Sequence, residues 1–186
     1  MSWIVKRNRT ERMVLIALFS TLTWIGAYLR IDFLPPVPFT LQTLMVIMAG
    51  LILGARYAAL SQGIYVLLGL IGVPVFTQGG GPGYLLRPGF GFILGFVLAA
   101  ALVGWLGSKF VKLSFFNSFL LSLVGMVAIY LMGIPYIYLI NILVLKNPVP
   151  LLKILLGMIP FMVGDVIKSL IVAGVAPVIV ERVSKI

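Results

Sequence analysis

An acidic and a basic side chain lie three residues apart inside one of the most apolar stretches of the chain. Asp165 and Lys168 belong to residues 160–168, whose other members are almost all apolar. At this spacing both side chains lie on one face of a helix. A charge at the centre of a membrane helix costs about 2.5–3.5 kcal/mol on insertion scales, so it usually faces a partner, a cavity or a ligand. The pair is therefore either part of a binding site or a simple neutralising pair that lets the helix insert.

The composition is that of a membrane protein. Of the 186 residues 62% are hydrophobic and 10% are charged, whereas soluble domains carry about 25% charged residues. Histidine and cysteine are absent, and the only acids are Glu11, Asp32, Asp165 and Glu181. A metal centre, a nucleophilic enzyme or a relay of several carboxylates is hard to build from this set. We therefore expect no catalytic residue, no metal site and no cofactor.

Six apolar segments predict six transmembrane helices in one integral membrane domain, residues 1–186. The segments cover residues 13–29, 41–54, 57–71, 90–106, 113–145 and 151–180. The fifth is longer than one span needs and contains Gly133, Pro135 and Asn141, so we predict a span followed by an irregular or interfacial segment. Glycines spaced four apart, at 50 and 54 and again at 91 and 95, predict close helix packing. The fold class is an all-α membrane protein.

The basic residues fit a topology with both termini in the cytoplasm. With six spans, the cytoplasmic side carries Lys6, Arg7, Arg9, Arg12, Arg56, Lys109, Lys112, Arg182 and Lys185, and the outer side carries Arg30, Arg87, Lys146 and Lys153. This asymmetry follows the positive-inside rule. It accounts for much of the formal net charge of +10 through topology, without a nucleic-acid partner.

Two unusual loops fall on the predicted outer side. Residues 34–40 are rich in proline, which excludes a regular helix, and residues 77–91 are rich in glycine. The glycine-rich segment has no following Gly-Lys-Ser/Thr, so it is not a phosphate-binding P-loop. It contains Tyr84 and Arg87, and we predict an ordered loop that converges with the proline-rich loop and the start of the sixth span over one cavity.

The predicted cavity combines one carboxylate with two cations. Asp165 accepts hydrogen bonds, whereas Lys168 and Arg87 donate them. The complementary ligand is a small anionic or zwitterionic solute with an apolar body. Gln42, near the start of the second span, is a further polar group that needs a partner at depth.

Three segments resemble the signature sequences of a known family. They read VPFTLQTL at 37–44, GGGPGYLLRPGFGFILGF at 79–96 and PFMVGDVIK at 160–168. In order and spacing they are similar to the BioY family, the biotin-specific S components of energy-coupling-factor (ECF) transporters. Two positions depart from the family pattern, namely Gly89, where threonine is usual, and Val163, where proline is usual.

The resemblance implies a protein of the bacterial cytoplasmic membrane that captures biotin outside with high affinity and moves it inward. Its partners would be biotin, membrane lipid, a transmembrane coupling protein and two ATPase subunits, which use the ATP. By resemblance, Arg87, Asp165 and Lys168 match ligand-contacting positions, and Tyr84 and Gln42 lie in the same signature segments. Asp165 would accept from the ureido N–H groups of biotin, while Lys168 and Arg87 serve its carbonyl or carboxylate.

The resemblance also implies a docking motif of two small residues in the first helix, at the positions of Ala17 and Thr21. Two other functions remain open at this point. One is an S component for a different small vitamin. The other is an autonomous secondary transporter or channel, which would take up its solute without an ATPase module.

Overall fold

Six α-helices carry most of the chain that the structure, a computed structural model, describes, namely residues 8–31 and 37–183. The helices are α1 (Arg9–Tyr28), α2 (Gln42–Leu53), α3 (Ala55–Leu70), α4 (Phe90–Gly107), α5 (Phe115–Leu143) and α6 (Leu151–Val183). Two short strands, β1 (Arg30–Ile31) and β2 (Phe39–Thr40), and a 3-10 helix, η1 (Pro82–Leu86), lie in the connections. The fold class predicted from the sequence, all-α, is confirmed.

Three of the described helices, α4, α5 and α6, are long and apolar enough to cross a membrane, and α2 is a shorter apolar helix. The chain is therefore a helical membrane protein. Local sequence sets several boundaries. Asn8 caps α1 in a reciprocal pair with Glu11, and the Ser114 side chain accepts from the Asn117 N–H at the start of α5. Gly54 separates α2 from α3 with φ 75°, a conformation that favours glycine.

Of the two endings predicted for residues 113–145, irregular or interfacial, the irregular one is wrong, because α5 continues as a helix through Gly133, Pro135 and Asn141. A side chain at Gly133 would overlap the ring of Phe92, its Cβ lying 2.5 Å from Cδ1, so this glycine permits contact with α4. The Asn141 amide donates to the Ile137 carbonyl at 2.9 Å, one turn back, which satisfies its polar group within the helix.

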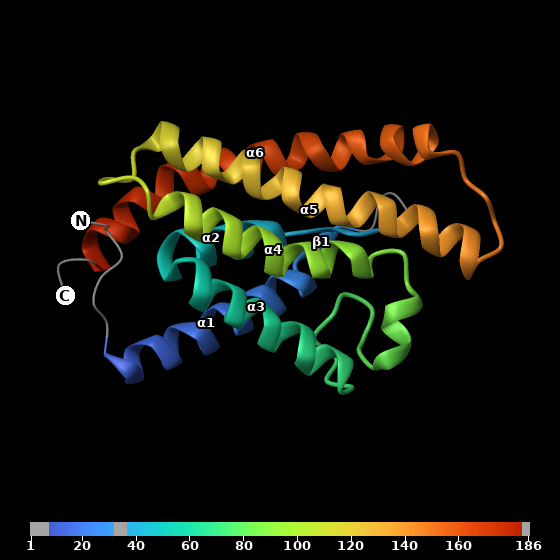
Figure 1. The fold of residues 1–186 in the computed structure, drawn as a ribbon, viewed down its shortest axis with the longest axis horizontal. Coiled ribbons are helices and arrows are strands. Elements are labelled where there is room, and N and C mark those ends of the chain that lie inside the picture. Colours follow the sequence, from blue (N-terminus) through green and yellow to red (C-terminus); the bar gives the residue numbers. More distant parts are fainter. Residues whose placement is uncertain (1–7, 32–36, 184–186) are drawn as a thin grey trace.

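Helix α4 lies in the middle of the bundle and packs against α2, α3 and α5 (Figure 1). Close approach requires glycine at three of the predicted positions, since a Cβ at Gly91 would overlap the Cβ of Tyr136. A Cβ at Gly50 would lie 2.9 Å from the Ala100 carbonyl oxygen, and one at Gly95 would lie 2.9 Å from the Ile129 Cα. The packing role predicted for these glycines is confirmed, whereas Gly54 acts in the turn between α2 and α3.

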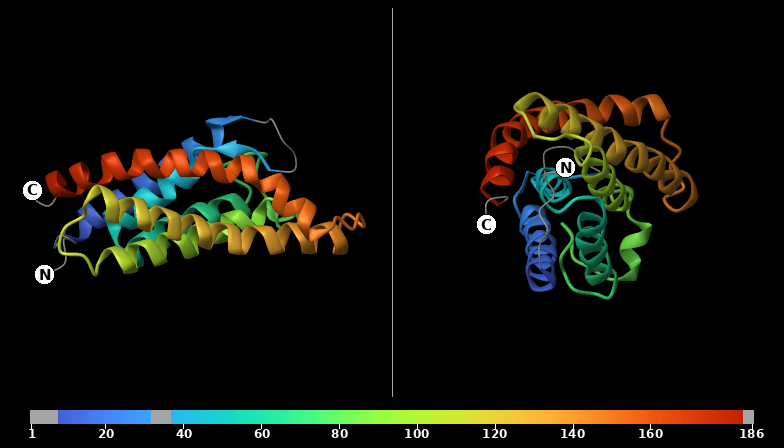
Figure 2. Two further views of the ribbon diagram at one scale, coloured as in Figure 1. Left: turned by 90° about the horizontal axis from the view of Figure 1, so that it is seen from above. Right: turned by 60° about the vertical axis from the view of Figure 1, so that its left-hand side comes forward.

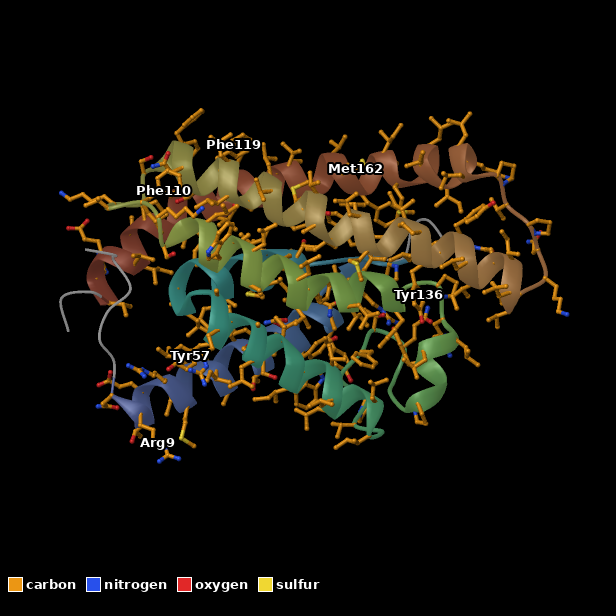
Figure 3. All side chains as sticks on the ribbon, in the orientation of Figure 1. Arg9, Tyr57, Phe110, Phe119, Tyr136 and Met162 are labelled. Carbon is orange, nitrogen blue, oxygen red and sulfur yellow. The ribbon has the colours of Figure 1, made fainter. Side chains whose placement is uncertain are left out.

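Figure 2 shows that the first residue of α1 and the last residue of α6 lie at the same end of the bundle. Arg9 and Tyr57 mark this end in Figure 3, and Tyr136 lies towards the other. The η1 segment and the β1–β2 ladder, in which Arg30 pairs with Thr40, also lie towards that other end. Part of the predicted proline-rich loop, residues 34–36, falls outside the described residues, as does Asp32.

The glycine-rich segment is ordered, as predicted. Gly81 adopts φ 103°, and its N–H donates to the Gly69 carbonyl at 2.7 Å, which ties the segment to the end of α3. On the other side, the Tyr136 hydroxyl of α5 donates to the Leu85 carbonyl. The segment is thus held between α3 and α5.

We predict that Gly95→Leu destabilises the bundle, because the new side chain meets the backbone of α5. Overpacking costs about 1–3 kcal/mol, which corresponds to a fall of roughly 5 °C in the unfolding temperature. The measurement is thermal unfolding of the purified protein in detergent. Gly63→Leu is the control, because a Cβ at Gly63 meets nothing within 4 Å. Equal effects of the two substitutions would contradict the packing role of Gly95.

Candidate functional site

One pocket brings together residues from the two loops and from four α-helices. Its walls come from the end of the β1–β2 connection with strand β2, the glycine-rich segment, the start of α2, and the facing sides of α4, α5 and α6. All five residues predicted as ligand-binding line it, namely Gln42, Tyr84, Arg87, Asp165 and Lys168. The predicted convergence of the two loops and the sixth span over a single cavity is confirmed.

Asp165 and Lys168 form an ion pair that is almost fully buried. The Lys168 Nζ lies 2.5 Å from the Asp165 Oδ1, and the two residues are 5% and 4% exposed. Both lie on the inward face of α6, one turn apart, as their spacing predicts. Charges at this depth need excellent geometry and further hydrogen bonds to offset their lost hydration.

The ammonium of Lys168 has a partner for each of its three N–H groups. Besides Asp165, it donates to the Thr40 carbonyl at 2.6 Å and to the Thr43 Oγ1 at 2.9 Å. The ring of Phe39 completes its surroundings, with the ring centroid 4.0 Å from Nζ. A ligand that hydrogen-bonds to Lys168 must therefore replace one of these partners.

The carboxylate of Asp165 is held by two hydroxyl groups in addition to Lys168. The Thr43 hydroxyl donates to Oδ1 and the Tyr130 hydroxyl to Oδ2, both at 2.8 Å. A carboxylate oxygen can accept two hydrogen bonds, and Oδ2 accepts one among the described residues. Asp165 thus has capacity to accept from a ligand N–H without losing a protein partner.

Thr43 and Tyr130 are missing from the residues predicted from the sequence. Thr43 stands next to Gln42 in the same signature segment, so its place there was the available signal. Tyr130 is one of three tyrosines in the long apolar segment, 35 residues from Asp165, and nothing in its spacing pairs it with Asp165. It is helix packing between α5 and α6 that brings them together.

Gln42 has the buried partners that its depth requires. Its Nε2 donates to the Tyr65 hydroxyl at 2.7 Å, and its Oε1 accepts from the Thr40 hydroxyl at 3.2 Å. The Tyr65 hydroxyl in turn donates to the Val75 carbonyl at 3.1 Å. Through Tyr65, Gln42 therefore connects the pocket wall with the backbone just before the glycine-rich segment.

Arg87 lines the pocket from the glycine-rich segment and is exposed. Its guanidinium donates to the Gln78 side-chain oxygen and lies 5.6 Å from the ring centroid of Tyr84. The Tyr84 ring is buried, and its hydroxyl lies 3.0 Å from the Thr77 hydroxyl. The structure thus lines one pocket with Arg87 and the buried pair, but the hydrogen-bond partner of Arg87 is neutral Gln78 and not Asp165.

The charged residues that line the pocket, Arg87, Asp165 and Lys168, leave it with one net positive charge. Rings and aliphatic side chains form most of the remaining wall, including Phe92, Ile93 and Phe161. This combination favours a small ligand with an anionic end, an apolar body and an N–H donor directed at Asp165.

The two residues predicted for partner docking lie outside the pocket, on the exposed face of α1. Ala17 and Thr21 are both exposed, and the Thr21 hydroxyl donates to the Ala17 carbonyl at 2.9 Å. Ser20, which is close by in sequence, is buried towards the bundle. These positions therefore expose only small side chains, and the Thr21 hydroxyl already has a hydrogen-bond partner.

Comparisons with known proteins agree with this architecture. The chain is 37% identical over 175 residues to a protein named probable biotin transporter BioY from Pyrococcus horikoshii, covering 94% of this chain and 96% of that one. It is 42% identical over 135 residues to a protein of the same name from Lysinibacillus sphaericus, covering 73% and 68% of the two chains.

A solved structure has the same fold over nearly the full length. It is a crystal structure of the S-component for biotin from an ECF-type ABC transporter, with a TM-score of 0.80 and 27% sequence identity, and the match covers 96% of this chain and 93% of that one. The family model for BioY matches residues 3–185. The chain belongs to the BioY family.

Proposed function

We propose that the chain captures biotin in this pocket and serves as the membrane-embedded S component of an ECF-type transporter. One observation carries the proposal: in this member of the BioY family, the buried Asp165–Lys168 pair and the separate cation Arg87 line the same pocket. Biotin has a ureido ring with two N–H groups, an apolar thioether ring and a carboxylate, which match the acceptor, the apolar wall and the cation.

The hydrogen bonds support one proposed orientation of the ligand. The ureido N–H groups lie against Asp165, because its Oδ2 has acceptor capacity left. The carboxylate of biotin lies against Arg87. The guanidinium donates to the neutral amide of Gln78, and a hydrogen bond to an anion would be stronger than this one. Lys168 chiefly orients Asp165, and the ring of Tyr84 packs against the Arg87 guanidinium. Gln42 lines the pocket and fixes Thr40 and Tyr65 by hydrogen bonds.

The proposed topology has six spans with both termini in the cytoplasm of a bacterial cell. Among the described basic residues, Arg9 and Arg12 lie in the first turn of α1, Arg56 lies in that of α3, Lys109 and Lys112 follow α4, and Arg182 lies in the last turn of α6; in this topology they face the cytoplasm. Arg30 follows α1, Arg87 follows η1, Lys146 follows α5, and Lys153 lies in the first turn of α6, and these four face outward. The positive-inside rule then places the pocket mouth outside the cell.

The proposed partners are a transmembrane coupling protein and two ATPase subunits. The solved relative is described as an S-component of an ECF-type ABC transporter, which supports a partner of this class. We place the contact on α1, where Ala17 and Thr21 let another helix approach closely. In this assignment the chain itself carries no catalytic residue, metal or cofactor, and it acts as one domain.

The direct test is equilibrium binding of biotin to the purified chain in detergent, together with Asp165→Asn. We expect saturable binding below micromolar biotin. The substitution should weaken it more than a hundredfold, because Lys168 is left buried without its counter-charge, at a cost of about 3–5 kcal/mol. Normal biotin affinity in Asp165→Asn together with poor membrane insertion would instead assign the pair a purely neutralising role. Tighter binding of another vitamin would reassign the ligand.

A second prediction concerns Thr43, whose hydroxyl joins both members of the pair. Thr43→Val removes a hydrogen bond to each charge, so biotin affinity should fall about tenfold or more. Thr43→Ser keeps the hydroxyl and should bind within roughly twofold of the parent. Isothermal titration of both variants makes the comparison. Equal losses in the two would show that the methyl group, rather than the hydroxyl, is required.

The docking face gives a third prediction. Ala17→Phe should reduce co-purification with the transmembrane coupling protein, because a bulky ring separates the helices, and should leave biotin binding unchanged. Val127→Phe, on the exposed side of α5, is the control. Biotin uptake by cells that lack the ATPase subunits would instead indicate an autonomous transporter.

A further inference from the structure

Gly164 immediately precedes Asp165 on α6, and the ring of Phe39 lies directly against it. A Cβ built on Gly164 would lie 2.5 Å from Cζ of Phe39 and closer still to Cε2. No real side chain tolerates such a contact, so the ring occupies space that only glycine leaves open. Phe161, one turn earlier on α6, packs on the same ring with centroids 6.3 Å apart.

The position of Phe39 fixes two of the contacts of Lys168. Its ring centroid lies 4.0 Å from the Lys168 Nζ, which is the geometry of a cation–π interaction. The next residue along strand β2, Thr40, supplies the carbonyl that accepts from the same nitrogen at 2.6 Å. Because Gly164 and Lys168 are four residues apart, they lie on one face of α6, and the Phe39 ring covers the turn between them.

Other glycines of α6 show that this requirement is local. A Cβ at Gly157 or at Gly174 meets nothing within 4 Å, so neither position needs a bare backbone for packing. Alanine is a better helix former than glycine, so a glycine within α6 lowers the stability of the helix unless it has another role. At Gly164 that role is to leave space for the ring of Phe39.

We propose that Gly164 is a positioning residue for the ligand site: its missing side chain seats Phe39, which holds strand β2 against α6 and closes the pocket beside Asp165 and Lys168. Phe39 and Phe161 both line the pocket, so the seated ring also forms part of the wall that contacts the apolar body of the ligand. The inference rests on the proposed function, with biotin as that ligand.

The test compares biotin binding by Gly164→Ala with that by Gly157→Ala and Gly174→Ala. In Gly164→Ala the new methyl group pushes the Phe39 ring off Lys168, so the Kd for biotin should rise about tenfold, mainly through faster dissociation. The unfolding temperature should change little, since the helix propensity gained with alanine offsets the lost contacts of the ring. The two controls should bind like the parent. Unchanged affinity in Gly164→Ala would overturn the proposal.

A double-mutant cycle with Phe39→Leu separates positioning from general damage. Phe39→Leu alone should weaken binding, and adding Gly164→Ala should then change the Kd by less than about twofold, since the displaced ring is already gone. Additive losses in the double variant would overturn the proposal. Parental affinity in Phe39→Leu would also overturn it, and this variant can be measured even if Gly164→Ala does not insert into the membrane. Absence of biotin binding by the parent chain would instead contradict the proposed function.

Discussion

The burial of one ion pair is the constraint on which the rest of the site depends. Asp165 and Lys168 are withdrawn from water within a largely apolar bundle, and unsatisfied charges at such depth would be strongly unfavourable. Their hydrogen bonds come from Thr43 at the start of α2, the backbone of β2, and Tyr130 on α5. Satisfying one pair therefore fixes the relative positions of four separate elements.

Backbone proximity makes this convergence possible. Residues that are more than 120 positions apart, such as Thr43 and Asp165, must approach to hydrogen-bonding distance. Two of the contacts that support it occur where side chains are missing, at Gly26 against the Gln42 backbone and at Gly164 against Phe39. The first contact holds the end of α1 beside the start of α2, and the second holds β2 on α6. Small residues thus set the geometry that the charged residues require.

Much of this organisation follows from the sequence, because its signals are local. Apolar length predicts each helix, and the cost of a buried charge marks Asp165 and Lys168 as a candidate site before any fold is known. The prediction fails for α5, since a proline and an asparagine were expected to end a span that in fact continues. Inside a helical bundle, a continuous helix keeps the backbone groups hydrogen-bonded. The side-chain amide of Asn141 donates to the Ile137 carbonyl one turn back.

The tertiary partners of the pair are the part that no local pattern reveals. Tyr130 and the Thr40 carbonyl contribute through helix packing and strand placement, and a backbone carbonyl leaves no mark in the sequence at all. For the same reason the sequence suggests two equivalent cations, Arg87 and Lys168, whereas the structure separates them.

That separation explains how a pocket can be stable and still respond to a ligand. A buried ammonium whose three N–H groups are all engaged contributes a fixed scaffold, and disturbing it would cost several hydrogen bonds at once. An exposed guanidinium on an amide oxygen is held much less firmly, and an anion can take the place of that partner with a gain in charge-assisted bonding. The pocket thus combines a rigid end, built on α6 and the carboxylate of Asp165, with an adaptable end on the glycine-rich segment. Ligand binding should reorganise the second end and leave the first in place, so that the buried pair stays satisfied whether the pocket is empty or full.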